Sequence, residues 1–465
     1  MKSNISGQQS AIRSSSDSCS KIRNQQSAII NSYHLVGIAG VGMNALAQVL
    51  LAQGCRVSGS DRYLDTGRSL DVLDKLRAAG ATLMSQDGSG VTDGLTGLVI
   101  SSAIEADNPD IAAARRKGVP ILHRAECLAL WANAKKSIAV TGTAGKTTVT
   151  GMIGWTLSEL GVDPTVVNGG ALLDWVGPRR IGNVRVGRSD VWVVEVDESD
   201  RSLLRFHPDW AVITNMSKDH FELSEVRHLF KAFAGQVDRG VVGCYGDDAD
   251  GEIRNGFKPD LSAEGIRFIY RGVDFKLPLL GRHNAENALQ SVMLCERLGH
   301  ALPGISRALA RFGGMQRRLE QVGTGRGVTV IDDYAHNPAK IAAAWDAVAP
   351  HYRRVLAVWR PHGFAPLALM LGELVQIFCA RVRPSDRIYI LPVYFVGGTT
   401  QRTVTSETLV KALRERGVCA ELAANYGDLL AQLKAEAQAG DVALWMGARD
   451  PDIGVYARRF VTELL

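Results

Sequence analysis

The feature that most constrains the fold is a glycine-rich loop between a short apolar run and a helical pattern. The apolar run covers residues 137–141, and the helical pattern continues to residue 160. The loop consists of Gly142, Thr143, Ala144, Gly145, Lys146, Thr147 and Thr148. Small residues let backbone N–H groups approach phosphate oxygens, and the dipole of the following helix favours negative charge. The order strand, loop, helix therefore predicts a phosphate-binding loop in an α/β domain, with ATP as its nucleotide.

Two side chains of the loop have defined roles in this interpretation. Lys146 supplies a point charge for the β- and γ-phosphates, and the Thr147 hydroxyl reaches Mg²⁺. The spacing is GxxGKT, because Val140 stands where the longer GxxxxGKT form has its first glycine. The alternative is a plain glycine turn with a solvated lysine.

A second glycine-rich turn lies near the start of the chain. An apolar run at 33–38 leads into Gly37, Ala39, Gly40, Gly42 and Met43, and the next strand ends on Asp61. A later strand ends on Ser101 and Ser102. This is the layout of a nucleotide-binding half-domain. Its GxxGxG spacing differs from the GxGxxG of dinucleotide enzymes, so an NAD-dependent oxidoreductase is only a distant alternative.

Strands and helices alternate in three blocks along the 465 residues. A chain of this length is too long for one ordinary core, and alternation of this kind is typical of parallel sheets. We therefore expect three α/β domains, each with a mostly parallel sheet: residues 33–133, 134–314 and 315–465. Residues 1–32 are rich in Ser, Gln and Asn, which predicts a disordered tail.

Polar residues at later strand ends are the remaining site candidates. Glu195 opens a run of four carboxylates in six residues, which repel one another unless a cation lies among them. With Thr147 and His220, Glu195 gives a predicted Mg²⁺ site. Capping and surface salt bridges are the alternative for the other three carboxylates.

Two further segments complete the candidate ATP site. Asn284 and Asn287 share one helix face, where their amides could read an adenine edge, although each is also a plausible helix cap. Arg318 is placed to clamp phosphoryl oxygens, and Asp333 to hold ribose hydroxyls. Turn formation is the alternative for Asp333 and its neighbours.

Composition excludes several other classes. The net charge of +5 is small and unclustered, which disfavours a nucleic-acid binder. No uninterrupted apolar run approaches the roughly 18 residues that span a bilayer, so no membrane partner is expected. The seven cysteines are scattered, which is typical of reduced thiols in a cytoplasmic protein.

Taken in order, these segments resemble the Mur ligases of peptidoglycan synthesis, and the alanine-adding members are the most similar. The similarity extends from about residue 33 to the C-terminus. It implies an ATP-dependent ligase that joins an amino acid, L-alanine or a variant, to the carboxylate of a UDP-N-acetylmuramate-like substrate through an acyl phosphate. The first domain would hold the UDP-sugar, the second ATP and the third the amino acid, in a monomer or homodimer. Such an enzyme serves cell-wall biogenesis, cell shape and division.

The resemblance also assigns site residues. It places the UDP-sugar at the first glycine-rich turn with Asp61, Ser101 and Ser102. It places the amino acid beside Arg360 and His362, where His336 assists the amine. The implied catalytic residues are Lys146, Glu195, His220, Arg318 and His336.

Three departures from the family pattern bear on the substrate. Ala144 stands where the loop usually has histidine, and residues 363–366 lack two arginines expected after His362. Residues 63–74 look inserted beside the uridine site. A specialised or non-catalytic paralogue is therefore the main alternative.

Overall fold

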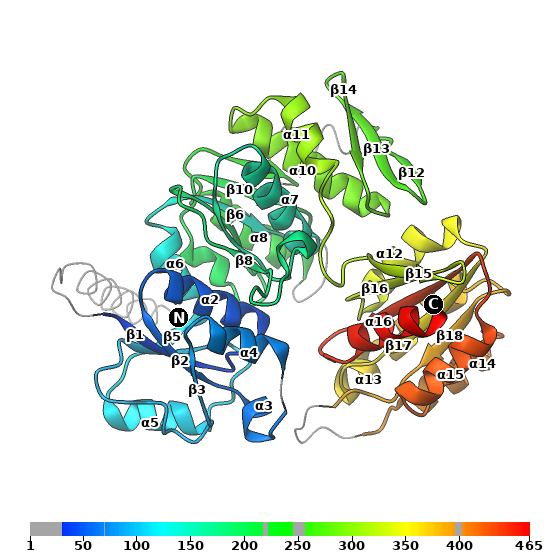
Figure 1. The fold of residues 1–465 in the computed structure, drawn as a ribbon, viewed down its shortest axis with the longest axis horizontal. Helices are drawn as coiled ribbons and strands as arrows, with labels where there is room; N and C mark the ends of the chain where they lie inside the picture. The colour runs from blue at the N-terminus through cyan, green and yellow to red at the C-terminus, as the bar shows by residue number, and fades with distance from the viewer. Residues whose placement is uncertain (1–29, 69, 217–221, 245–255, 396–401) are drawn as a thin grey trace, which may run out of the picture.

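The computed structural model contains one large sheet in each of three successive parts of the chain, and a small three-stranded sheet in the middle part (Figure 1). It describes residues 30–68, 70–216, 222–244, 256–395 and 402–465. The first part lies beside the middle one, and the third lies across from both. Three α/β domains with mostly parallel sheets are thus confirmed, whereas the domain boundaries stay predictions. The predicted tail lies outside the described residues up to 29, and the first strand begins at Ser32.

The first domain has a five-stranded parallel sheet of order β3-β2-β1-β4-β5. Its strands are β1 (Ser32–Val36), β2 (Arg56–Ser60), β3 (Thr82–Met84), β4 (Gly97–Ile100) and β5 (Ile121–His123). Its helices are α2 (Val41–Ala52), α3 (Arg62–Asp65), α4 (Asp71–Ala78), α5 (Pro109–Lys117) and α6 (Arg124–Ala132). Helices cover both faces of a parallel sheet, which is why β1 is almost wholly buried.

The middle domain has a six-stranded sheet of order β11-β10-β6-β9-β7-β8, in which only β8 is antiparallel. The strands are β6 (Lys136–Thr141), β7 (Thr165–Val167), β8 (Val184–Arg185), β9 (Val191–Glu195), β10 (Trp210–Ile213) and β11 (Gly240–Gly243). The helical segments are α7 (Lys146–Glu159), η1 (Leu173–Trp175), η2 (Ser202–Arg205), α8 (Leu223–Ala234), α10 (Arg282–Arg297) and α11 (Leu302–Leu309). A small antiparallel sheet is added by β12 (Asp260–Ser262), β13 (Gly265–Tyr270) and β14 (Val273–Leu277). Helix α7 packs so closely on the sheet that a Cβ on Gly154 would lie 2.7 Å from Val166.

The third domain has the order β15-β16-β20-β17-β18-β19, in which only β15 is antiparallel. The strands are β15 (Glu320–Gly325), β16 (Val328–Asp333), β17 (Arg354–Arg360), β18 (Arg387–Ile390), β19 (Ala420–Leu422) and β20 (Asp441–Gly447). The helical segments are α12 (Pro338–Val348), η3 (Ala349–His351), α13 (Phe364–Arg381), α14 (Ser406–Arg414), α15 (Tyr426–Glu436) and α16 (Ile453–Leu464). Separate hydrophobic clusters lie on the two faces of this sheet, so helices cover both faces.

Helix α13 contradicts the expectation that no apolar run of this chain is long enough to span a bilayer. Its 18 residues have a mean hydropathy of 1.4, which by length and composition is enough to cross a membrane. The expectation failed because it required an uninterrupted run, whereas α13 reaches this mean with Pro366 and Glu373 inside it. In the structure, Leu374 and Phe378 of α13 pack in the third domain's core.

Candidate active site

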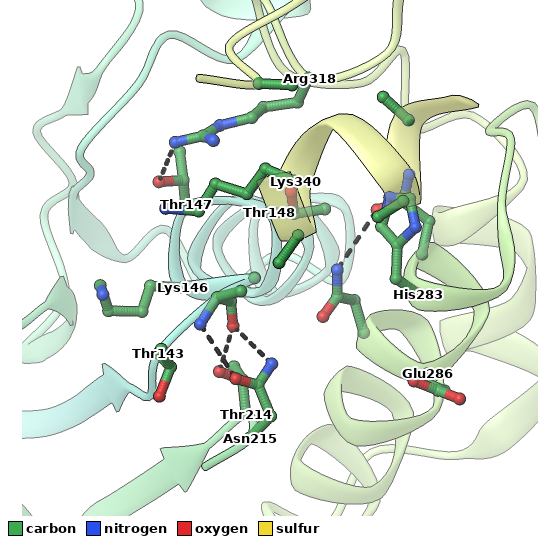
Figure 2. A pocket seen from close by; sticks show the side chains of 18 of the residues that line it. Thr143, Lys146, Thr147, Thr148, Thr214, Asn215, His283, Glu286, Arg318 and Lys340 are labelled. Carbon is green, nitrogen blue, oxygen red and sulfur yellow. Dashed lines mark hydrogen bonds between the residues drawn. The ribbon is translucent and has the colours of Figure 1, made fainter. Parts of the chain in front are cut away.

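The carboxyl end of β6 opens into a cavity of about 360 Å³ between the middle and third domains. The phosphate loop forms one wall, α10 a second, and residues of α12 with Arg318 the third (Figure 2). Ligand cavities of this size bind nucleotide-sized molecules. The cavity thus brings together predicted site residues from separate segments of the sequence: the phosphate loop, Glu195, Asn284 with Asn287, Arg318 and Asp333.

The phosphate loop requires glycine at two positions. Gly142 has φ of 127°, and a Cβ there would lie 2.2 Å from Thr214 Oγ1. Gly145 has φ of 85°, and its Cβ would lie 2.5 Å from Asn287 Oδ1. Asn215 braces the loop from β10's end, because its side chain accepts from the Ala144 N–H at 3.0 Å and donates to the Ala144 carbonyl at 2.9 Å. The loop is therefore held open and rigid by neighbouring side chains.

Lys146 is held inside the cavity wall by a carboxylate. Its Nζ donates to Glu198 Oε2 at 2.7 Å and to the Gly142 carbonyl at 2.8 Å, with Asp197 Oδ1 at 4.0 Å. Burial acts to lower the pKa of Lys146, but the Glu198 and Asp197 carboxylates outweigh it and the pKa is raised. Burial raises the pKa of Glu198, against the effect of Lys146. We take the pair as ionised, since its geometry is that of a charge-assisted hydrogen bond.

Thr147 and Glu195 lie together as the metal prediction requires. The Thr147 hydroxyl donates to Glu195 Oε1 at 3.2 Å, and the Gly169 N–H donates to Glu195 Oε2 at 2.7 Å. Hydroxyl and carboxylate oxygens fit Mg²⁺ bound beside nucleotide phosphates. His220, the third predicted ligand, lies outside the described residues, and within them no group of three or more His, Cys, Asp or Glu side chains is arranged to hold a metal ion. Mg²⁺ stays a prediction.

Arg318 enters the cavity from the third domain. Its Nη2 donates to Thr147 Oγ1 at 3.4 Å, so its guanidinium lies against the start of helix α7 (Figure 2). The backbone around it is unusual, because Arg317 and Leu319 both have positive φ, 58° and 49°. Such conformations are costly for non-glycine residues and persist only where the surroundings impose them. Arg318 is thus presented to the phosphates by a constrained turn.

Asp333 holds that turn in place. Its carboxylate accepts from the Leu319 N–H and the Ala335 N–H, both at 2.8 Å. Burial raises the pKa of Asp333 despite these bonds and the nearby Arg318. The predicted contact of Asp333 with ribose hydroxyls is untested, although its side chain does line the cavity.

Asn284 and Asn287 line the cavity, but their amides are engaged within the protein. Asn284 Nδ2 donates to the Leu280 carbonyl at 2.9 Å, and Asn287 Nδ2 donates to Asn284 Oδ1 at 3.2 Å. Adenine recognition by these amides stays a prediction. Their observed contacts place Asn287 against Gly145, where it supports the phosphate loop.

Two histidines from neighbouring loops meet in the third domain. The rings of His336 and His362 lie 5.0 Å apart, edge to face. His336 Nδ1 is 2.9 Å from the Tyr334 carbonyl, which selects the tautomer that leaves Nε2 unprotonated. Burial lowers the pKa of each histidine to about 4. Both imidazoles are neutral near pH 7, so His336 can accept a proton.

Arg360, predicted to bind the amino acid, already has a carboxylate partner. Its Nη1 donates to the buried Asp450 at 2.6 Å, and its Nε donates to the Pro392 carbonyl at 3.1 Å. Its guanidinium also lies over the rings of Tyr394 and Tyr426. Arg360 and His362 stay predicted ligands of the amino acid. In this structure the Arg360 guanidinium is paired with Asp450.

The first glycine-rich turn is organised by Asp61. Its carboxylate accepts from the Ala39 N–H at 2.9 Å and from the Tyr63 N–H at 3.1 Å, and burial raises its pKa. Gly37 has φ of 73°, and a Cβ on Gly42 would lie 3.0 Å from Arg124. Of the other candidates, Gly40 caps α2, Met43 is buried in α2, and Ser101 and Ser102 follow β4. Their role toward a UDP-sugar is untested.

Several residues in or beside the cavity were not assigned their roles from the sequence. For Glu198, a place in the cation crevice and a capping or surface role were both left open, because the sequence does not show that Lys146 points toward it. Asn215, Gln290 and Lys340 have no motif of their own. A polar residue directly after the apolar run of β10 was the one available signal for Asn215, since carboxyl ends of parallel strands share an edge.

Comparisons with known proteins identify the class. Residues 32–136 match the description "Mur ligase family, catalytic domain", 140–235 the Mur ligase middle domain, and 317–449 the "Mur ligase, glutamate ligase domain". The chain therefore belongs to the Mur ligase family, and it is an ATP-dependent ligase of the acid–amino-acid class. An NAD-dependent oxidoreductase is excluded by this membership.

Individual relatives indicate which members of the family this chain is similar to. A UDP-N-acetylmuramate–L-alanine ligase of a Synechococcus strain is 36% identical over 450 residues, covering 91% of this chain and 90% of the relative. One from Gloeobacter violaceus is also 36% identical, covering 93% and 95%. The crystal structure of the Thermotoga maritima UDP-N-acetylmuramate-alanine ligase has a TM-score of 0.76 at 27% identity, covering 93% and 98%. A murein peptide ligase from Psychrobacter arcticus, with a TM-score of 0.64 at 19% identity, shares the fold.

Proposed function

We propose that this ligase joins L-alanine, or a similar amino acid, to the carboxylate of UDP-N-acetylmuramate, with Mg²⁺ and ATP, in the cytoplasm. One observation carries the proposal: Lys146 and Arg318, from different domains, line the same cavity as the Thr147–Glu195 pair, and Arg318 donates to Thr147. The alanine-ligase relatives support the choice of substrates. The UDP-sugar is assigned to the Gly37–Met43 turn, and the amino acid to the His336–His362 side of the third domain.

The first chemical step brings two anions together. The sugar carboxylate attacks the γ-phosphate, an acyl phosphate forms and ADP leaves. Lys146 and Arg318 neutralise the charge that builds up on the transferring phosphoryl group. For Lys146 this means exchanging Glu198 for phosphate oxygens, which a flexible ammonium can do without moving the loop.

Thr147 and Glu195, with His220 as the further predicted ligand, would hold Mg²⁺, which neutralises phosphate charge when bound. The Gly169 N–H fixes the carboxylate of Glu195. Asn215 fixes the loop backbone at Ala144 by bonding both its N–H and its carbonyl.

The second step takes place on the third-domain side. The amine attacks the acyl carbonyl, a tetrahedral intermediate forms, and phosphate is released as the C–O bond breaks. The neutral His336 can accept the proton that the amine loses. The third domain also supplies Arg318, so the phosphate site is complete only when this domain lies against the loop. That coupling protects the acyl phosphate from water.

The test is amine-dependent ADP release with a panel of UDP-sugars and amino acids. We expect stimulation by UDP-N-acetylmuramate together with L-alanine or another small amino acid. Nucleotide binding without turnover for every pair would overturn the proposal and favour a non-catalytic paralogue. Size-exclusion chromatography with light scattering distinguishes the monomer from the homodimer, the two states that we expect.

A further inference from the structure

Residues 62–68, named here the strap, lie at the edge of the first domain that faces the third (Figure 1). The strap comprises α3 and the turn that follows it. It belongs to the segment that looked inserted in the sequence, and no part of the ligase chemistry uses it.

Two side chains of the strap contact the third domain. The Tyr63 hydroxyl lies 3.3 Å from the Tyr394 hydroxyl, and Arg68 Nη2 donates to Asp452 Oδ1 at 2.7 Å. The Arg68 guanidinium also lies over the Tyr63 ring, so the two contacts form one unit. The strap thus joins residues of two domains that lie more than 300 positions apart in the sequence.

Tyr394 and Asp452, the two residues that the strap contacts, are each linked to Arg360. Tyr394 lies against the Arg360 guanidinium, and its N–H donates to the Pro361 carbonyl at 2.8 Å. The N–H of Asp452 donates to Asp450 Oδ1 at 2.9 Å, and the other oxygen of Asp450 accepts from Arg360. Through Tyr394 and Asp452, the strap is therefore linked to Arg360 and Pro361, the two residues that precede His362.

The other end of the strap reaches the proposed UDP-sugar turn. Asp61 accepts hydrogen bonds from both the Tyr63 N–H of the strap and the Ala39 N–H of the turn. Asp65 fastens the strap to its own domain by accepting from the Gln86 N–H at 3.0 Å. The strap consequently connects the sugar side of the first domain to the amino-acid side of the third.

We infer that Tyr63 and Arg68 are positioning residues, which hold the third domain closed and set Arg360 and His362 for the incoming amino acid. This inference rests on the proposed function for its kinetic readout only. Loosening the strap should raise KM for the amino acid and release phosphate without amide, because the acyl phosphate meets water. A residue with a merely structural role would lower amide and phosphate formation together.

The experiment is a charge exchange in the full-length enzyme. Arg68→Asp and Asp452→Arg should each raise KM for the amino acid and the phosphate-to-amide ratio about two- to fivefold, the range of a partly exposed ion pair, with little change in kcat. The double exchange should return both values toward wild type. Arg77→Asp is the control, since Arg77 pairs with Asp74 inside α4. Single exchanges indistinguishable from Arg77→Asp, or a double variant no better than the worse single, would overturn the inference.

A second pair of substitutions controls for structural damage that the charge reversals could cause. Tyr63→Phe and Tyr394→Phe remove the hydroxyl contact without changing charge, and the double variant should be no worse than the worse single variant. Additive effects would contradict the contact. Should no substrate pair support turnover, small-angle scattering of the ATP-bound protein still decides. We then expect a larger radius of gyration for Arg68→Asp that reverts in the charge exchange, and no such change would refute the strap.

Discussion

The two glycine-rich turns of this chain have similar backbones and different chemistry. Each follows the first strand of its domain, opens a helix and lies at the carboxyl edge of a parallel sheet. The Gly142–Thr148 loop carries the Lys146–Glu198 pair and the Thr147–Glu195 pair. The Gly37–Met43 turn is instead braced by a carboxylate, that of Asp61. Backbone N–H groups can bind a phosphate, whereas transferring one needs cations beside them, so we expect only the Gly142–Thr148 loop to act in phosphoryl transfer.

The largest expected effect separates the two turns directly. Lys146→Ala should lower ADP formation about 10²–10³-fold, because it removes a charge from the transition state. It also leaves Glu198 buried without its cation, which costs about 3–5 kcal/mol of stability for a broken buried pair. Steady-state kinetics and urea unfolding measure the two losses.

A matched double variant distinguishes those losses. Lys146→Ala with Glu198→Gln should recover most of the stability and none of the activity. Turnover near the wild-type rate in either variant would remove Lys146 from the mechanism.

The next effect concerns the metal. Glu195→Gln should raise the Mg²⁺ concentration for half-maximal activity about 10–100-fold, as the loss of a group that tunes a metal site does. EDTA should abolish wild-type activity, and added Mg²⁺ should restore it. Glu225→Gln, in which a surface carboxylate paired with Arg201 is neutralised, should match wild type. An unchanged Mg²⁺ requirement in Glu195→Gln would argue against Glu195 as a ligand.

A substitution at the first glycine-rich turn should weaken binding of the UDP-sugar and leave binding of ATP unchanged. Asp61→Ala removes the acceptor of two backbone hydrogen bonds, each worth roughly 1 kcal/mol, so the affinity for UDP-N-acetylmuramate should fall about tenfold. The Kd for ATP should stay at the wild-type value. Calorimetry with each ligand measures both. Weakened ATP binding, or unchanged sugar binding, would break the division of labour between the turns.

The smallest effect is expected at Ala144. The N–H and carbonyl of Ala144 are hydrogen-bonded to the Asn215 side chain, and Ala144 is exposed. Ala144→His, which restores the usual family residue, should therefore shift KM for ATP by about twofold at most, the range of a surface substitution. A change of tenfold or more in kcat would show that the histidine has a chemical role that this chain has lost.

The sequence was sufficient where residues adjacent in the chain define a structure. The phosphate loop, the three α/β blocks and the polar strand ends follow from glycine spacing and apolar runs. It was insufficient where partners come from distant segments. Nothing near Lys146 predicts its bond to Glu198, and nothing near Arg360 predicts Asp450 or Tyr394. Those pairings depend on how the sheets and domains pack, which one sequence does not encode locally.

The most direct test of the central claim follows an oxygen atom. If the sugar carboxylate attacks ATP and the amine then displaces phosphate, one carboxylate oxygen must leave with the phosphate. UDP-N-acetylmuramate labelled with ¹⁸O in its carboxylate, incubated with ATP, L-alanine and the enzyme, should yield inorganic phosphate carrying one ¹⁸O by mass spectrometry. Amide product formed together with unlabelled phosphate would contradict the acyl phosphate and the roles given to Lys146 and Arg318.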